Sequence, residues 1–268
     1  MLDSELRPGS QHCQKGAAAF IEGLKKRLRV IQRGGRFLFR LDSGNDSFDT
    51  LKAVSDTGKG YYCIIKRNKR KEKEEEWLRR AKRHGKRVES REGKKVWVGT
   101  APMHPKRKGE TLSDIRCVFE VTERKIDREG NRLLIPEIEV NTWWTNLRCG
   151  AEKVIELYHG HATSEQFHGE LKHDMGIERL PSGKLAVNKI VLSVAMNAYN
   201  TLKLLGQKSI EKKSRGKFKR RRLGKVIREL ICAAGKLVRH GGELAFKIYE
   251  KAPMAPIILR LNAALDCS

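Results

Sequence analysis

The hydrophobic positions of the first third of the chain predict one helix followed by a strand–helix–strand unit. Residues 16–32 carry apolar side chains at helical spacing, opposite a basic face, and two glycines follow them. The short apolar runs RFLFRL (36–41) and YYCIIK (61–66) predict buried strands, with a short helix over residues 48–57 between them. This order is typical of a βαβ unit with two parallel neighbouring strands. Asp42 would then lie at the carboxyl end of a central strand, where open α/β sheets place functional sites.

The pattern changes to alternation in the middle of the chain. KVWVGTA, IRCVFEVTER and RLLIPEIEVNTWWTNL alternate and are rich in β-branched and aromatic residues, which predicts an antiparallel β-subdomain over residues 95–147. DREG at 127–130 predicts a turn within it. A helix is expected over residues 150–175 and a long apolar, buried helix over 185–205. Two further helices are expected around 223–239 and 242–250. The predicted fold class is therefore α/β.

The net charge of the chain indicates which kind of binding partner it favours. The chain holds 57 Lys+Arg against 32 Asp+Glu, a net charge of +25, with 39% hydrophobic residues for a core. Such an excess favours a polyanion, and nucleic acid is the simplest one. An anionic membrane is the rival partner, but no apolar run approaches the ~20 residues that span a bilayer, and no signal-peptide core begins the chain. The basic run at residues 66–95 could belong to the surface that binds this partner, and it could equally form a solvated face.

The six cysteines are scattered without a C-x-x-C pair. They are typical of reduced, mostly buried thiols in a cytosolic protein, and a zinc ribbon or finger is not supported.

One helical face carries candidate chemistry. If residues 158–172 form a regular α-helix, four polar side chains fall within a sector of roughly 60°: Tyr158, His161, Glu165 and Lys172. Phe167 and Leu171 lie on the opposite side and would anchor the helix in a core. Glu165 alone could be a solvated carboxylate. His161 and Glu165, an i,i+4 pair, could share zinc, but no cysteine or further carboxylate shows ligand spacing.

The spacing Tyr158-x2-His161-x3-Glu165-x6-Lys172 resembles the YREK signature of bacterial insertion-sequence transposases of the DDE type, with His161 in the arginine position. The segment RFLFRLDSGNDSF resembles the strand that carries the family's second acidic residue, here Asp42. Further segments also resemble the family, so the resemblance covers nearly the whole chain: LDSELRPGSQHCQKG, TNL at 145–147 and LPSGKLAVN.

The resemblance implies an RNase H-like catalytic domain with an antiparallel β insertion and C-terminal helices. Its segments would be 1–66 (first part of the catalytic domain), 67–148 (basic linker and insertion), 149–205 (remainder of the catalytic domain) and 206–268 (basic helical region). The implied activity is transposition of an insertion sequence by Mg²⁺-dependent DNA cleavage and strand transfer. Asp42 and Glu165 would be the catalytic metal ligands for Mg²⁺ or Mn²⁺, which prefer carboxylate oxygens.

The resemblance also implies DNA contacts. Tyr158 and Lys172 would contact phosphates, and His161 more weakly, because a neutral imidazole offers one donor where arginine offers a fork. Trp143 and Trp144 could stack on a base, or they could be core residues. The basic run at 217–222 could follow DNA phosphates or form a solvated loop, and its candidates are Lys219, Arg220, Arg221 and Arg222.

One departure from the family concerns its first catalytic aspartate, which is expected upstream of the ELRPG-like segment. Only Met1, Leu2 and Asp3 precede Ser4 and Glu5, so the expectation is a truncated copy that lacks the residue. The alternatives are an inactive DNA-binding remnant that acts as an inhibitor, and a nuclease on the same fold. The expected partners are double-stranded DNA, at the element's ends and at the target, and a second copy in an active homodimer. The expected location is the bacterial cytoplasm, at the nucleoid when bound to DNA.

Overall fold

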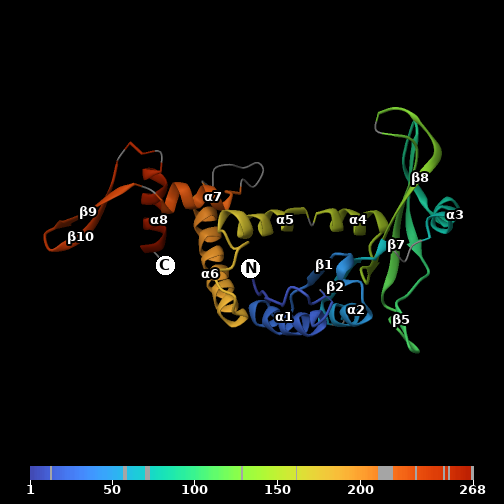
Figure 1. Ribbon diagram of the computed structural model, residues 1–268, viewed down its shortest axis with the longest axis horizontal. Coiled ribbons are helices and arrows are strands. Elements are labelled where there is room, and N and C mark those ends of the chain that lie inside the picture. Colours follow the sequence, from blue (N-terminus) through green and yellow to red (C-terminus); the bar gives the residue numbers. More distant parts are fainter. Residues whose placement is uncertain are drawn as a thin grey trace. The chain divides into compact units, whose positions relative to one another are not determined.

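The computed structural model describes the backbone of residues 1–268 except 13, 57–58, 70–72, 128, 161, 211–219, 233, 250, 253 and 267–268. Side chains are also left out at residues 90, 162–165, 240 and 264–266. The chain forms two compact units (Figure 1). The sheet unit comprises Gly9–Ala162, and the helical unit comprises Met1–Pro8 with Thr163–Ser268. None of the described helices combines the length and apolar character that crossing a bilayer requires.

A six-stranded mixed sheet forms the centre of the sheet unit, with strand order β1-β2-β8-β7-β4-β3. Its strands are β1 (Phe37–Leu41), β2 (Tyr61–Lys66), β3 (Lys86–Arg91), β4 (Lys94–Ala101), β7 (Arg116–Ile126) and β8 (Arg132–Thr145). β1 and β2 are parallel, which confirms the predicted βαβ unit, whereas every other neighbouring pair is antiparallel. The antiparallel strands of the predicted β-subdomain therefore continue the same sheet.

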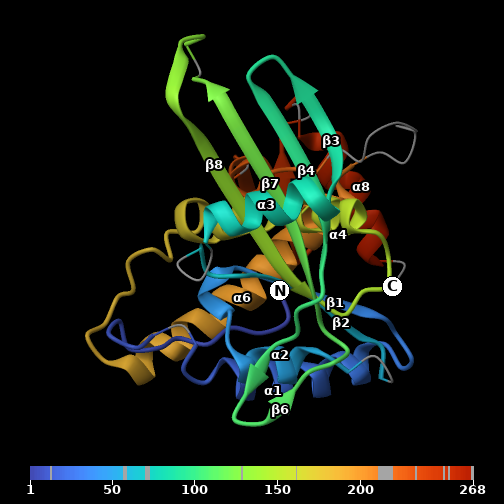
Figure 2. The ribbon, with the colours of Figure 1, turned by 90° about the vertical axis from the view of Figure 1, so that its right-hand side faces the viewer.

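Helices cover both faces of this sheet (Figure 2). On one face lie α1 (Ala17–Ile31), α2 (Phe48–Val54) and α3 (Glu74–His84), and on the other lies α4 (Ala151–His159). β2 consists of a continuous apolar run because Cys63 and Ile65 face one layer while Ile64 faces the other. The 3-10 helix η1 (Ser43–Asn45) follows β1, and the short strands β5 (Lys106–Arg107) and β6 (Glu110–Thr111) form a separate ladder.

The basic run at residues 66–95 is more than a solvated face. Trp77 and Ala81, an i,i+4 pair on α3, are buried against the sheet, while the charged side chains of the helix face outward. β3 follows within the same run and was not predicted.

The helical unit contains α5 (Ala162–Gly169), the π-helix η4 (Glu170–Asp174), α6 (Leu185–Lys208), α7 (Leu223–Val226), the π-helix η5 (Ile227–Ile231) and α8 (Ala255–Asp266). The expectation that α6 is buried was wrong. Only one stripe of it is packed (Asn188, Ala195, Tyr199 and Gly206), and Ile190 and Val194 remain 66% and 63% exposed. Apolar composition alone does not determine how many faces of a helix find partners.

The helix expected at 223–239 is confirmed over residues 223–231, where α7 and η5 lie, but its second half and the helix expected at 242–250 were wrong. Strands β9 (Gly235–His240) and β10 (Glu243–Ile248) form an antiparallel hairpin there (Figure 1). The connecting residues Gly241 and Gly242 have φ values of 56° and 87°. A two-residue turn with positive φ at both positions matches the twist of a hairpin, and glycine adopts it without strain.

Asn146 closes a gap in the sheet. β8 ends at Thr145, so β2 has no strand partner on that side beside Tyr61 and Cys63. The Asn146 side chain fills this place: Oδ1 accepts a hydrogen bond from the Cys63 backbone N–H at 2.8 Å, and Nδ2 donates to the Tyr61 carbonyl at 3.0 Å. The buried amide thus pairs the Cys63 N–H and adds a second donor to the Tyr61 carbonyl, which also accepts from the Asp56 N–H at 3.3 Å.

We predict that Asn146→Ala destabilises the sheet unit by roughly 1–3 kcal/mol, because it leaves the buried Cys63 backbone N–H unpaired and removes one of the two donors to the Tyr61 carbonyl. Urea unfolding followed by tryptophan fluorescence measures this, since all four tryptophans lie in the sheet unit. Asn131→Ala, in an exposed turn, is the control and should change stability by less than about 0.5 kcal/mol. Equal effects of the two substitutions would contradict the bridging role.

Candidate active site

Asp42 directly follows β1 and is exposed to solvent. Its backbone is still extended, and its Oδ1 accepts a hydrogen bond from Asn45 Nδ2 at 2.8 Å. Within the described residues Oδ2 accepts no hydrogen bond. The predicted position at the carboxyl end of a parallel strand is therefore confirmed, but β1 is the edge strand of the sheet and not the expected central strand. The carboxylate is accessible to a ligand.

Tyr158 on α4 lies within the electrostatic field of Asp42, although the two are far apart in the sequence. Its ring packs against Trp143, with ring centroids 5.6 Å apart. Burial raises the pKa of the Tyr158 phenol, and the negative charge of Asp42 raises it further. The structure thus brings together two of the predicted site residues and keeps the phenol protonated, as a hydrogen-bond donor.

Asp46 ends the same turn and has the opposite environment. It is buried, its Oδ1 accepts a hydrogen bond from Trp144 Nε1 at 3.1 Å, and its Oδ2 accepts one from the Asn68 backbone N–H at 3.0 Å. The guanidinium of Arg67 lies over the Trp144 ring, 4.6 Å from its centroid. Asp46 therefore holds the turn that presents Asp42.

The two tryptophans are core residues, so the prediction that they stack on a base is corrected. Trp143 is 0% exposed and Trp144 is 6% exposed. They point to opposite faces of β8, Trp143 toward α4 and Trp144 toward the α1–α3 layer. Neither ring presents a face on which a base could stack.

The segment that was expected to form one helix is divided. α4 ends at His159, α5 carries the backbone of Glu165, and Lys172 lies in the π-helix η4. His161 lies outside the described residues, and so does the side chain of Glu165. Lys172 is exposed and forms no ion pair with the part of the chain that is described. Because the π-helix widens the turn, Lys172 is rotated from its position in a regular α-helix.

The described part of the basic run 217–222 is neutralised within the helical unit. Arg220 pairs with Glu170, Arg221 with Glu229 at 2.7 Å, and Arg222 with both carboxylate oxygens of Asp174 at 3.1 Å. These pairs favour a structural role for the three arginines over a DNA-phosphate track. Lys219 lies outside the described residues.

Glu170 is the centre of this network. It is 3% exposed and accepts hydrogen bonds from the Tyr199 hydroxyl at 3.3 Å and the Leu223 backbone N–H at 3.1 Å. Lys203 Nζ lies 3.4 Å from the same carboxylate. Burial, together with the Glu170 charge, raises the pKa of Tyr199 to about 12.

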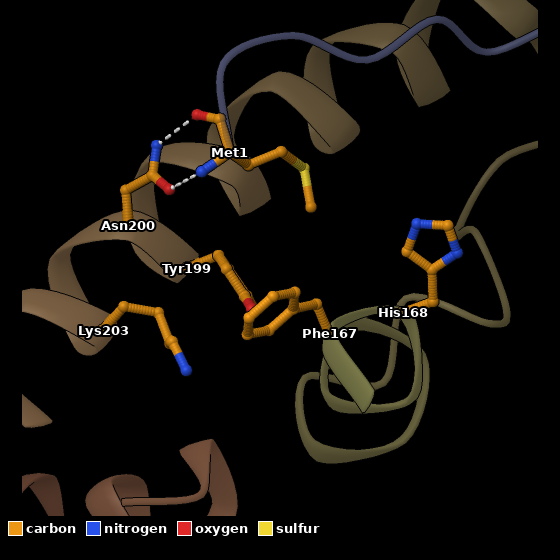
Figure 3. A pocket seen from close by; sticks show the side chains of 6 residues that line it. All are labelled: Met1, Phe167, His168, Tyr199, Asn200 and Lys203. Atoms are coloured by element: carbon orange, nitrogen blue, oxygen red, sulfur yellow. Dashed lines mark hydrogen bonds between the residues drawn. The ribbon is translucent and has the colours of Figure 1, made fainter. Parts of the chain in front are cut away.

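A cavity of about 320 Å³ lies beside this network (Figure 3). Phe167, His168, Tyr199, Lys203 and Asn200 line it, and Asn200 bonds to the Met1 backbone. The lining is mostly apolar, and its lysine, Lys203, already pairs with Glu170. We therefore interpret this cavity as part of the packing of the helical unit and not as a ligand site. No group of three His, Cys, Asp or Glu side chains that could hold a metal ion occurs among the residues with described side chains.

Two residues of the Asp42 region were missed by the sequence analysis. Asp46 could not be distinguished from Asp42 by composition. Arg40 could have been found, because residues i and i+2 of a strand share a face, which places Arg40 beside Asp42. Its Nη1 donates a hydrogen bond to the Leu157 carbonyl of α4 at 2.8 Å.

A family model described as transposase DDE domain group 1 matches residues 1–267. Among curated proteins, none matches the chain.

We predict that Asp42→Asn lowers the pKa of Tyr158 toward its ordinary value, because the substitution removes the negative charge but leaves the burial. Titration of ¹³C-labelled tyrosine rings by NMR, assigned with Tyr158→Phe, measures this pKa. Asp49→Asn is the matched control, since Asp49 is an exposed acid whose partner is Arg107. An unchanged Tyr158 pKa in Asp42→Asn would show that the two groups do not interact.

We predict that Glu170→Ala destabilises the helical unit by roughly 3–5 kcal/mol, because it leaves the buried guanidinium of Arg220 without its counter-charge. Glu170→Gln should cost less, since its amide oxygen still accepts from Leu223. Hydrogen exchange of the Leu223 amide reports the effect directly, and the sheet unit's tryptophan fluorescence should not change. Unaltered protection at Leu223 in Glu170→Ala would rule out the central role of this carboxylate.

Proposed function

We propose, from the premise that this chain belongs to the transposase DDE domain group 1 family, that it cuts and joins DNA at the ends of an insertion sequence. The observation that carries the proposal is the exposed carboxylate of Asp42 at the end of β1, with the protonated phenol of Tyr158 in its field. An accessible acid beside a hydrogen-bond donor is suited to a phosphodiester substrate.

The mixed α/β fold supports this proposal. We infer that the parallel β1–β2 pair and its connecting helix belong to an RNase H-like catalytic core, into which the long β7–β8 hairpin is inserted. In open α/β sheets, sites lie at the carboxyl ends of strands, and Asp42 occupies such an end.

The metal chemistry is proposed for two carboxylates. DDE transposases typically use divalent metal ions. Asp42 fits such a ligand by its exposure and by its Oδ2, which accepts no hydrogen bond from the part of the chain that is described. Asp42 and Glu165 would hold Mg²⁺ or Mn²⁺, which prefer hard oxygen ligands. When bound, such ions activate the attacking oxygen and stabilise the leaving oxygen of the phosphodiester.

The remaining residues would bind and orient DNA. The raised pKa of Tyr158 keeps its hydroxyl as a donor for a phosphate oxygen. Lys172 would contribute a point charge and His161 a single donor. We propose double-stranded DNA, at the element's ends and the target, as the partner of the +25 chain, with two copies holding the two ends. The place of action would then be the nucleoid.

We predict that Asp42→Asn and Glu165→Gln each abolish Mg²⁺-dependent cleavage of an end-labelled duplex taken from the DNA that flanks the coding sequence, while binding is retained. Asp49→Asn is the control, because it removes an equal charge elsewhere in the sheet unit and should leave cleavage unchanged. Cleavage that survives in Asp42→Asn would overturn the site. Salt-sensitive binding without any cleavage by the wild type would favour the alternative, a DNA-binding protein without catalysis.

A further inference from the structure

Arg40 occupies a fixed position between β1 and α4. It lies two residues before Asp42, so the two side chains share a face at the same end of the strand. Its Nη1 donates to the Leu157 carbonyl at 2.8 Å, and that carbonyl belongs to the last turn of α4, where backbone oxygens lack helical partners. One hydrogen bond therefore anchors both the guanidinium and the helix end that carries Tyr158.

The approach of Arg40 to α4 depends on Gly160. A Cβ atom at that position would lie 3.2 Å from Arg40 Nη1, closer than ordinary contact. The absence of a side chain lets the guanidinium lie against the helix end. The position of the guanidinium is thus set by the backbone of β1 and α4. Arg40 therefore loses less side-chain conformational entropy on binding a ligand than an arginine usually does.

The other donors of this guanidinium form no hydrogen bond with the residues whose side chains are described. Arg40 is half-buried, and among residues with described side chains no carboxylate lies within ion-pair distance of it. This contrasts with Arg220, Arg221 and Arg222, each of which has an acidic partner. A partly desolvated cation with free, planar donors is suited to an anion with two oxygens, such as a phosphodiester.

We propose that Arg40 binds the scissile phosphodiester, with its free donors on the non-bridging oxygens next to Asp42. Its positive charge compensates the negative charge that a phosphate adds beside a carboxylate. This role rests on the proposed function, since Asp42 identifies which phosphate of the DNA is the reacting one.

Salt dependence of binding tests the contact without requiring cleavage. The full chain binds a fluorescent duplex from the flanking DNA in EDTA, and log K is measured against log salt. Arg40→Ala should reduce the slope by about 0.9, the value for one lost phosphate contact. Arg36→Ala is the matched control, because it removes the same charge at the opposite end of β1 and should leave the slope unchanged. An unchanged slope in Arg40→Ala, even with a lower Tm, would reduce Arg40 to a structural tether and overturn the proposal.

Cleavage at saturating DNA in Mg²⁺ gives a second readout. Arg40→Ala should lower the rate about 100-fold, and Arg40→Lys should recover only part of it, because an ammonium lacks the planar fork. Full recovery by lysine would contradict the two-oxygen contact. If the wild type fails to cleave, the proposed function fails, and the salt slopes still decide the role of Arg40. If the wild type cleaves and Asp42→Asn does not, but Arg40→Ala matches the wild type in rate and slope, only this inference fails.

Discussion

The register of β8 against β2 and β7 determines where the candidate site residues lie. Neighbouring residues of a strand point to opposite faces, so Trp143 packs under α4 while Trp144 reaches the other layer. Trp143 supports the ring of Tyr158, and Trp144 donates its indole N–H to Asp46 in the turn that carries Asp42. A slip by one residue would exchange the two faces and remove both supports at once. Two adjacent tryptophans thus connect an acid and a phenol on different elements.

The cationic side chains fall into three groups according to their surroundings. Some cations are neutralised locally, as in the Glu170 and Asp174 pairs that hold the start of α7. Others lie over aromatic rings, as on α3, where the Arg80 guanidinium lies 5.4 Å from the centroid of the buried Trp77 ring. A third group, which includes Arg40 and Lys172, has no acidic partner among the described side chains. Only this last group has free charge for phosphates, so net charge indicates a polyanionic partner but not which residues meet it.

Sequence patterns predicted those elements whose burial follows from their own periodicity. The apolar run of β2 is buried as predicted, whereas β1 is the edge strand of the sheet and has no buried residue. The parallel pairing of the two strands and the strand-end position of Asp42 were predicted correctly. The β9–β10 hairpin was missed although Gly241-Gly242 signals a two-residue turn, because helical and alternating spacing overlap in short apolar segments. The exposure of α6 and the bridge made by Asn146 depend on what packs beside them. Such tertiary contacts leave no periodic signal in the chain.

Residues of one type acquire different roles through their environment. Asp42 and Asp46 are four residues apart in one turn, yet Asp46 is buried with an indole and an amide as donors, while Asp42 is exposed with an oxygen to spare. A buried, satisfied carboxylate stabilises geometry and would lose its partners if it bound a ligand. An exposed carboxylate on a fixed turn can bind a ligand with little loss of conformational entropy. The same comparison separates Arg220, whose charge is matched by Glu170, from Arg40, whose anchoring bond is to a neutral carbonyl. In both pairs the structural residue has partners for its polar atoms. The residue at the carboxyl end of β1 instead has polar atoms that form no hydrogen bond with the described residues.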